Sequence, residues 1–231
     1  MTRANAALPP VTLVRRYDTH RLIPCQYSEP DSVLGLIADD PAHLADLFEL
    51  DHATNDRLLA ENQRGAGIGV HELVFGVPHY RVVNAAFTHP HPLGSRFNGP
   101  GRGAWYAAFE LRTAQAEVAF HKSVQLSEIG CFLDEVTYDD YQSDVSAPLH
   151  DLREAPGFAG CLAPDSYIAS QLLAERLLAA DSLGVVYPSV RRRAGTCVGL
   201  FRPAVVTHLR RARTWRFIWK GKPTPVIEPL A

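Results

Sequence analysis

The chain has 231 residues, a length that suits one domain of generous size or one domain with an extension. Its 46% hydrophobic content is ordinary for a soluble globular protein, and a formal charge of -2 argues against a dedicated nucleic-acid binder. No stretch approaches the apolar length that spans a bilayer, and the N-terminal segment lacks the apolar run of a signal peptide. We therefore expect a cytoplasmic protein that does not associate with membranes.

The residue types that usually bind metals are poorly arranged for that purpose. The four cysteines, at positions 25, 131, 161 and 197, include no CxxC pair, so we expect incidental or buried thiols rather than a zinc site or disulfides. His89 and His91 form a His-x-His pair, but no third ligand accompanies them at metal spacing. We expect two solvated loop histidines and no metal.

The first third of the chain divides into an irregular segment and a helical one. Prolines punctuate residues 1 to about 35, which predicts irregular structure there. From Asp40 to Gly65 apolar residues recur at helical spacing, and Asp40 with Pro41 has the order of a helix cap followed by a first-turn proline. We interpret residues 1–70 as an N-terminal helical extension packed on a core domain of residues 71–231.

The core domain begins with short apolar runs and then a glycine-rich loop. Residues 73–75 and 79–83 read as its first strands, separated by Gly76 and Pro78. The loop from Gly94 to Gly103 carries glycine and proline at a density that excludes helix and strand, and it lets backbone approach a ligand closely.

A short strand and a helix follow the loop. In residues 105–109, Trp105, Ala107 and Phe109 point to one face of the strand and Tyr106 and Ala108 to the other. The next helix is predicted to be capped by Thr113, to carry Glu117 and to end near His121. The loop, strand and helix could bring Arg96, Tyr106 and Glu117 to one pocket.

The second half of the chain alternates strands with one clear helix. We expect a strand at 132–138 and a solvated acidic loop up to residue 146, because the carboxylates lack the spacing of a calcium loop. Asp165-Ser166 should cap a helix that ends at Gly184. The remaining predicted strands are residues 185–187, 197–201, 205–209 and 215–219.

The C-terminal run HLRRARTWRFIWKGK interleaves basic and aromatic residues. Single-stranded nucleic acid would be bound by such a pattern, with bases stacked on rings and phosphates paired with arginines. The alternation also fits an antiparallel edge strand with Trp215, Phe217 and Trp219 on one side. We favour the edge strand and do not expect nucleic acid as a partner.

Several short motifs occur in a familiar order. Tyr80-Arg81-Val82, Arg96-Phe97-Asn98, the glycine loop, Tyr106, Glu117 and Tyr187-Pro188-Ser189 resemble the RES-domain family over roughly the last two-thirds of the chain. The family consists mostly of toxins of toxin–antitoxin pairs that destroy NAD. The resemblance implies an α+β fold with a split, mainly antiparallel sheet and flanking helices, similar to ADP-ribosyltransferases. It also implies a small antitoxin encoded by the adjacent gene, and it leaves homo-oligomerisation open.

The resemblance assigns roles residue by residue. Glu117 matches the family glutamate and is the expected catalytic carboxylate at the ribose, while Arg81 and Arg96 match the two arginines and are expected to bind phosphate. Arg96 is also counted with Glu117 in the catalytic pair. Tyr106 and Ser189 match the tyrosine and serine of the NAD site. The chain departs from the pattern near Cys197, where many relatives have Asn, and at Phe97, where many have Trp.

The implied activity is cleavage of the nicotinamide–ribose bond of NAD, by phosphorolysis or hydrolysis. NAD is then a substrate, no cofactor is needed, and inorganic phosphate is the expected co-substrate. A carboxylate beside the ribose suits the stabilisation of an oxocarbenium-like transition state. The alternatives are ADP-ribosyl transfer to a macromolecule and, from a different class, a nucleic-acid-binding module that uses the C-terminal strand.

Overall fold

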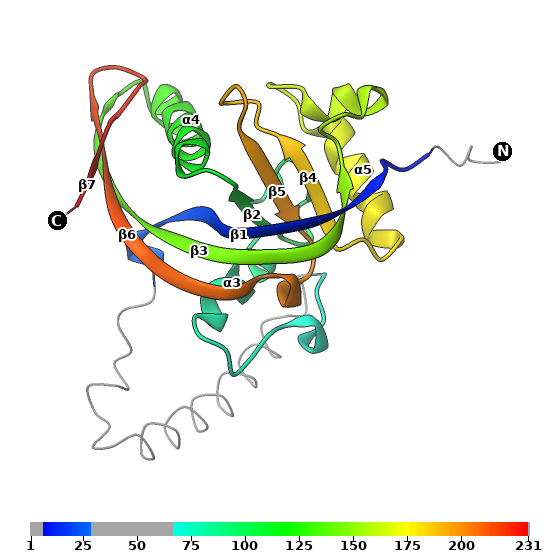
Figure 1. The fold of residues 1–231 in the computed structure, drawn as a ribbon. Coiled ribbons are helices and arrows are strands. Elements are labelled where there is room, and N and C mark those ends of the chain that lie inside the picture. The colour runs from blue at the N-terminus through cyan, green and yellow to red at the C-terminus, as the bar shows by residue number, and fades with distance from the viewer. Residues whose placement is uncertain (1–6, 29–66, 231) are drawn as a thin grey trace, which may run out of the picture.

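A computed structural model describes residues 7–28 and 67–230, and the fold is built around one sheet of seven strands (Figure 1). The strands of this part of the chain are β1 (Val11–Pro24), β2 (Trp105–Ala108), β3 (Leu133–Asp151), β4 (Gly184–Pro188), β5 (Thr196–Leu200), β6 (Thr207–Lys220) and β7 (Val226–Pro229). Its α-helices are α3 (Tyr80–Thr88), α4 (Leu111–Ile129) and α5 (Ile168–Ala179). Its short 3-10 helices are η1 (Cys25–Tyr27), η3 (Val70–Glu72), η4 (Pro156–Leu162) and η5 (Pro203–Val205).

The sheet is mainly antiparallel, as the sequence predicts. Its order is β1-β2-β5-β4-β3-β6-β7, and β1 also pairs with β3, so five of the strands close into a ring. Two of the strand pairings that close this ring are short. Strand β1 pairs with β2 only between His20 and Ala108, and β3 pairs in parallel with β4 only through His150 and Asp151. The predicted mixture of a mainly antiparallel sheet with helices is therefore confirmed.

Helices cover both faces of the sheet, and each face has its own core. In Figure 1, α4 and α5 lie on one side of the curved β1 and β3, and α3 lies on the other. Strand β2 shows how alternation supplies both cores: Trp105 and Ala107 join the core beneath α3, and Tyr106 and Ala108 join the core beneath α4 and α5. The predicted facing of this strand is confirmed.

The N-terminal segment is part of the sheet. Residues 11–24, predicted to be irregular, form β1, which pairs with β3 over most of its length. Val14 and Leu22 are buried in the two different cores, because a register shift between Arg16 and Thr19 changes which side chains face each one. The domain boundary expected at residue 70 therefore does not separate residues 7–28 from the core. The helices expected between Asp40 and Gly65 lie outside the described residues.

The segment before the glycine loop is helical rather than extended. The strands expected at 73–75 and 79–83 are wrong, because residues 73–75 are irregular backbone after η3 and residues 80–88 form α3. Val82, Val83 and Phe87 are buried at helical spacing. The side chain of Asn84 also donates to the Val74 carbonyl at 2.8 Å and accepts from the Val74 amide at 3.1 Å.

Three predicted helix boundaries are wrong. Helix α4 begins at Leu111 after Glu110 and ends at Ile129, followed by Gly130 with a φ of 75°, so Thr113 is not its cap and His121 is not its end. Helix α5 ends at Ala179, and Gly184 instead opens β4, where a Cβ would lie 2.4 Å from the Gly199 carbonyl oxygen. The apolar pattern located both helices correctly. It placed the start of α4 too late, the end of α4 too early and the end of α5 too late.

Three predicted strand patterns also change. The expected acidic loop after residue 138 is strand, since β3 continues to Asp151 and buries Asp139 and Asp140 against Thr214 and His20. The two strands expected at 205–209 and 215–219 are one continuous β6. Strand β7 pairs along it, so β6 is not an edge strand for residues 215–218.

Candidate functional site

The glycine-rich loop is held in shape by Tyr106 of β2. The Phe97 amide donates to the Tyr106 hydroxyl at 2.8 Å, and that hydroxyl donates to Asn98 Oδ1, also at 2.8 Å. A Cβ at Gly103 would lie 2.0 Å from the Ala86 carbonyl oxygen, so this position admits only glycine. Burial raises the pKa of Tyr106 above its ordinary value, so the ring remains a neutral phenol.

Glu117 and Ser189, two of the predicted site residues, are in direct contact. Ser189 Oγ donates to Glu117 Oε1 at 2.6 Å, joining α4 to the end of β4 across 72 residues of sequence. The same oxygen is 3.8 Å from Cys197 Sγ. Burial and the neighbouring carboxylates raise the pKa of Cys197, so the thiol stays protonated and can donate weakly to Glu117.

The Ser189 hydroxyl is itself oriented by its own turn. The amides of Arg191 and Arg192 donate to Ser189 Oγ at 3.1 and 3.0 Å, which leaves the hydroxyl proton for Glu117. The turn is tied to the start of α4, because Glu110 Oε2 accepts from the Thr196 amide at 3.2 Å. Glu117 is therefore a positioned carboxylate rather than a solvated one.

Arg96 is buried, and its contacts differ from those of a waiting phosphate ligand. Its Nη1 donates to the carbonyl oxygens of Cys161 at 3.2 Å and Ala163 at 2.8 Å, and the guanidinium lies 4.8 Å from the centre of the Tyr167 ring. These contacts fix the glycine loop to the segment that precedes α5. The Arg96 charge still acts on the site, because it lowers the pKa of the nearby Tyr187 hydroxyl against a larger rise caused by burial.

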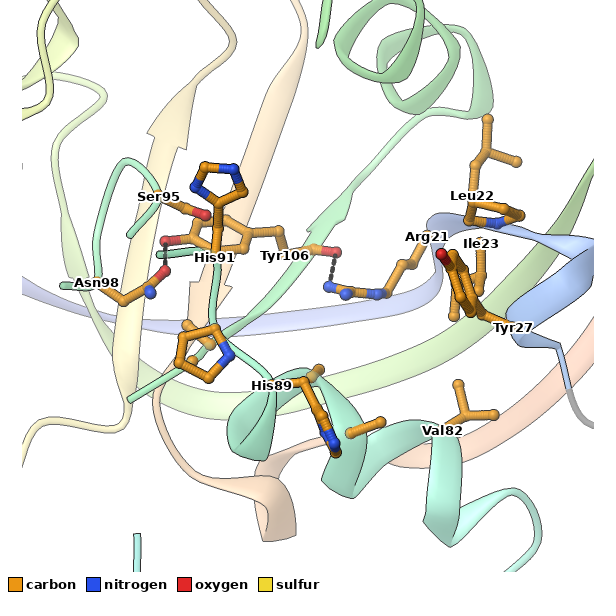
Figure 2. A pocket seen from close by; sticks show the side chains of 16 residues that line it. Arg21, Leu22, Ile23, Tyr27, Val82, His89, His91, Ser95, Asn98 and Tyr106 are labelled. Atoms are coloured by element: carbon orange, nitrogen blue, oxygen red, sulfur yellow. Dashed lines mark hydrogen bonds between the residues drawn. The ribbon is translucent and has the colours of Figure 1, made fainter. Parts of the chain in front are cut away.

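The cavity beside Tyr106 is the clearest ligand-sized hollow near these residues. It has a volume of about 360 Å³, at the lower end of the range usual for small-molecule sites. Its walls come from β1, α3, the glycine loop and β2, as Figure 2 shows. Its polar lining includes Arg21, His89, His91, Ser95, Asn98 and Tyr106.

Arg21 is the site residue that the sequence did not reveal. Its Nη1 donates to the Tyr106 carbonyl at 3.1 Å, and its guanidinium lies over Trp105, 4.6 Å from the ring centre. Burial lowers the pKa of Arg21 to about 10, so the group is still a cation at neutral pH. Since Arg21 meets Tyr106 only through the pairing of distant strands, no local pattern identifies it.

Arg81 lies elsewhere. It is an exposed residue of α3, 5.9 Å from the centre of the Tyr80 ring, and it is not among the residues that line the cavity. Its phosphate-binding role was expected from the family resemblance, and the strand on which it was expected to lie is in fact a helix. The structure thus brings together Glu117 with Ser189 and Tyr106 with the cavity, but it leaves Arg81 outside.

Glu117 lies beside Cys197 of β5, the strand that pairs with the Tyr106 strand β2. Glu117 does not line the cavity itself. Burial is the main reason that the pKa of Tyr187 is raised, and Cys197, Tyr106 and Glu117 contribute to the same shift. His121 lies one turn after Glu117 on α4. Desolvation lowers the pKa of His121, and the charge of Glu117 opposes that shift.

The described residues offer no aromatic nucleic-acid surface on the buried rings of β6, no metal-ligand cluster and no membrane-spanning helix. Phe217 and Trp219 of β6 are buried in the core, so these rings cannot stack on bases. Within residues 7–28 and 67–230 no group of three or more potential ligand side chains is placed to hold a metal ion. No helix of the same part of the chain is long and apolar enough to cross a membrane.

Comparison with known proteins adds one strong match. A family model described as the RES domain matches residues 72–220, well over half of the chain. No curated protein matches. Among solved structures, the chain is similar to the M. tuberculosis MbcT–MbcA toxin–antitoxin complex, with a TM-score of 0.49, 13% identity, and coverage of 88% of this chain and 85% of that one. A likeness that weak adds nothing to the family match.

Proposed function

Because the chain belongs to the RES-domain family, we propose that it cleaves the nicotinamide–ribose bond of NAD, preferentially by phosphorolysis. The observation that carries the proposal is the 2.6 Å contact with Ser189, which holds the Glu117 carboxylate beside Cys197 of β5, the strand paired with β2. A carboxylate held in place by a hydroxyl suits the stabilisation of the oxocarbenium-like transition state of glycosidic chemistry. The ADP-ribosyltransferase-like form of the fold belongs to the same proposal.

The leaving group makes a general acid unnecessary. Nicotinamide is cationic while it is attached, so the bond between its ring nitrogen and ribose C1′ breaks with both electrons moving to that nitrogen. A phosphate oxygen then forms the new bond to C1′, giving nicotinamide and ADP-ribose phosphorylated at that carbon. The Glu117 carboxylate stabilises the positive charge on the ribose between the two events. Ser189 keeps the carboxylate in place.

Arginine side chains bind the phosphate groups of NAD. In this proposal Arg21 takes the role that the sequence assigned to Arg81, since it is the arginine that lines the cavity. One of its five N–H groups is donated to the Tyr106 carbonyl, and the planar fork suits phosphate oxygens. Arg96 contributes its charge and holds the loop that carries Ser95 and Asn98.

Incubation of the purified chain with NAD, with and without inorganic phosphate, tests the proposal. We expect nicotinamide release that depends on phosphate, together with a phosphorylated ADP-ribose. Equal release without phosphate would indicate hydrolysis, and labelled ADP-ribose retained on a macromolecule would indicate transfer. If no nicotinamide appeared under any of these conditions, the chain would not be an NAD-cleaving enzyme.

We also propose that the chain is the toxin of a toxin–antitoxin pair. This part rests on family membership. Expression of the chain alone should arrest growth, and co-expression of the adjacent gene should restore it and yield a complex in a pull-down. Normal growth on expression of the chain alone would overturn this part, and arrest that persists with a catalytically inactive Glu117→Gln chain would separate toxicity from NAD loss.

A further inference from the structure

The mouth of the cavity holds three ring-bearing side chains that the proposed chemistry does not use. They are Tyr27 from η1, His89 from the end of α3, and His91 from the loop that follows. Tyr27 is 71% exposed although it lines the cavity, so its ring is available to a ligand. Figure 2 shows Tyr27 beyond Arg21 on one side of the cavity and His91 near Ser95 on the other.

The two histidines present opposite hydrogen-bonding groups. Thr88 Oγ1 donates its proton to the Asn84 carbonyl at 3.1 Å, so it can only accept from His89 Nδ1, 2.9 Å away. In the neutral ring, His89 Nε2 is then an acceptor. His91 Nδ1 accepts from the Leu93 amide at 3.2 Å, so in the neutral ring His91 Nε2 carries the proton and is a donor.

We propose that Tyr27, His89 and His91 form a subsite for the adenine base of the dinucleotide, which deepens the proposed function and rests on it. The ring of Tyr27 stacks on the base. His89 Nε2 accepts from the 6-amino group, and His91 Nε2 donates to N7 of the same base, which is an acceptor in adenine and hypoxanthine alike. Adenine offers one donor and several acceptors at its edge, which matches this pair.

The direction of the dinucleotide follows from the same placement. Glu117 does not line the cavity, whereas Arg21 does, and the three rings stand at its mouth. The reacting ribose therefore lies toward Glu117, the pyrophosphate at Arg21, and the adenosine half outermost. His89 and His91 were expected to be plain solvated histidines, and the position of both in the cavity lining is what changes that interpretation.

The test exploits an analogue in which hypoxanthine replaces adenine, so that the 6-position is a carbonyl acceptor instead of an amino donor. At pH 8, where a free imidazole is neutral, kcat/KM for NAD should exceed that for the hypoxanthine dinucleotide by roughly tenfold, the value of one hydrogen bond. His89→Phe keeps a flat ring but loses Nε2, and it should reduce this preference to about one. His71→Phe, an exposed η3 histidine outside the cavity lining, is the matched control and should keep the preference.

Two further variants separate stacking from edge recognition. Tyr27→Leu should weaken both dinucleotides to a similar extent, by about tenfold, because stacking is indifferent to the 6-substituent. Nicotinamide mononucleotide lacks the base, so its cleavage should be unchanged in the Tyr27 and His89 variants. A Tyr27 variant that lost activity on the mononucleotide as well would place the ring at the reacting end and overturn the subsite.

A binding measurement keeps the inference distinct from the proposed function. Calorimetry with ADP-ribose and its hypoxanthine counterpart should show the same preference, and His89→Phe should remove it. If NAD is cleaved but His89→Phe leaves both preferences intact, the adenine subsite is wrong and the NAD activity stands. If no substrate is cleaved and ADP-ribose binds with the predicted preference, the cleavage proposal fails and the subsite stands.

Discussion

At the scale of single residues, the site depends on how one carboxylate is held. Glu117 lies on a helix where a solvated carboxylate would be ordinary, and only the contact with Ser189 distinguishes it. The serine in turn is oriented by two amides of its own turn. This chain of contacts fixes the charge before any substrate arrives, which is the condition for electrostatic stabilisation of a transition state.

The first prediction concerns the charge of Glu117. The substitution Glu117→Gln preserves size and shape but removes the charge that stabilises the ribosyl cation. Stabilisation of this kind is worth about 3–4 kcal/mol, so kcat should fall by roughly two to three orders of magnitude. KM for NAD should change much less, because the loss lies in the transition state.

Thermal unfolding supplies the control for this variant, since a misfolded chain would also be inactive. Wild type and Glu117→Gln should have melting temperatures within a few degrees of each other. Turnover near that of wild type would remove Glu117 from the catalytic role.

The second prediction concerns the hydroxyl that holds Glu117. Ser189→Ala removes a hydrogen bond to a charged group, so kcat should fall by roughly tenfold or more while KM stays close to wild type. Cys197→Ala is the matched control: it also removes a contact with Glu117 Oε1, but a weak one at 3.8 Å. Steady-state kinetics of the two variants should therefore differ clearly. Equal losses would mean that packing around Glu117, rather than the hydroxyl, matters.

At the scale of elements, β1 is the segment whose structural role differs most from expectation. It supplies Arg21 to the cavity and buries Val14 and Leu22 in the two cores. Its antiparallel partner β3 lies more than 100 residues further along the chain. The element that supplies the cavity arginine thus comes from the region that looked like an accessory extension.

The third prediction tests this placement of β1. Leu22→Ala removes a side chain that is only 7% exposed, and it should destabilise the chain by about 2–4 kcal/mol in urea unfolding. Leu13→Ala, on the same strand but 56% exposed, should change stability by less than about 0.5 kcal/mol. If the two variants had equal stability, residues 11–24 would not be part of the folded core.

Much of the fold after residue 100 could be predicted because its signals are local. Strand β2 has alternating faces within four residues, and α4, α5, β4 and β5 follow apolar patterns of the right period. Strand β1 could not be predicted, because its polar-rich pattern becomes a strand only by pairing with β3. The Val82-Val83 pair favours a strand on propensity, but burial of Phe87 at helical spacing decides for α3.

The candidate site was predictable to the extent that its motifs are short and local. Glu117, Ser189 and Tyr106 were identified by their order, and the structure places Glu117 against Ser189 and Tyr106 at the cavity. Arg21 could not be found, since its proximity to Tyr106 arises from strand pairing alone. The deep burial of Arg96 was equally invisible, because its partners are backbone carbonyls of a segment 65 residues away.

At the scale of the whole molecule, Glu72 joins three segments that are distant in sequence. Arg102 of the glycine loop donates to both its oxygens, at 2.9 and 2.7 Å, and Arg202, from the segment after β5, donates at 2.7 Å. Arg102 also donates to the Phe201 carbonyl at 2.8 Å. This cluster, Glu72 with Arg102 and Arg202, anchors one end of the loop that shapes the cavity.

The fourth prediction follows from the charge of Glu72. The hydrogen bond from Arg102 is the main reason that the pKa of Glu72 falls from 4.5 to about 2. A carboxyl whose folded pKa is depressed stabilises the fold above its unfolded pKa, and this contribution is lost as pH falls from about 4.5 to about 2. Glu72→Gln should therefore cost about 2–3 kcal/mol at pH 7 and progressively less below pH 4.5.

Urea unfolding of wild type and Glu72→Gln across this pH range provides the measurement. The gap in unfolding free energy should narrow as the pH falls, because protonated Glu72 and Gln are then nearly equivalent. A gap that stayed constant with pH would mean that Glu72 acts through shape rather than charge. Arg216→Gln, whose partner Glu228 lies at the outer strand pair β6–β7, should leave the free energy of unfolding nearly unchanged.

The pairing of β1 with β3 has a consequence for how the protein is made. During synthesis residues 11–24 leave the ribosome first, yet their partners on β3, residues 138–150, follow more than a hundred residues later. Arg21 cannot take its place against Tyr106 until that pairing closes, so a nascent or prematurely ended chain has no complete cavity. The cavity is therefore complete only after most of the chain has been synthesised.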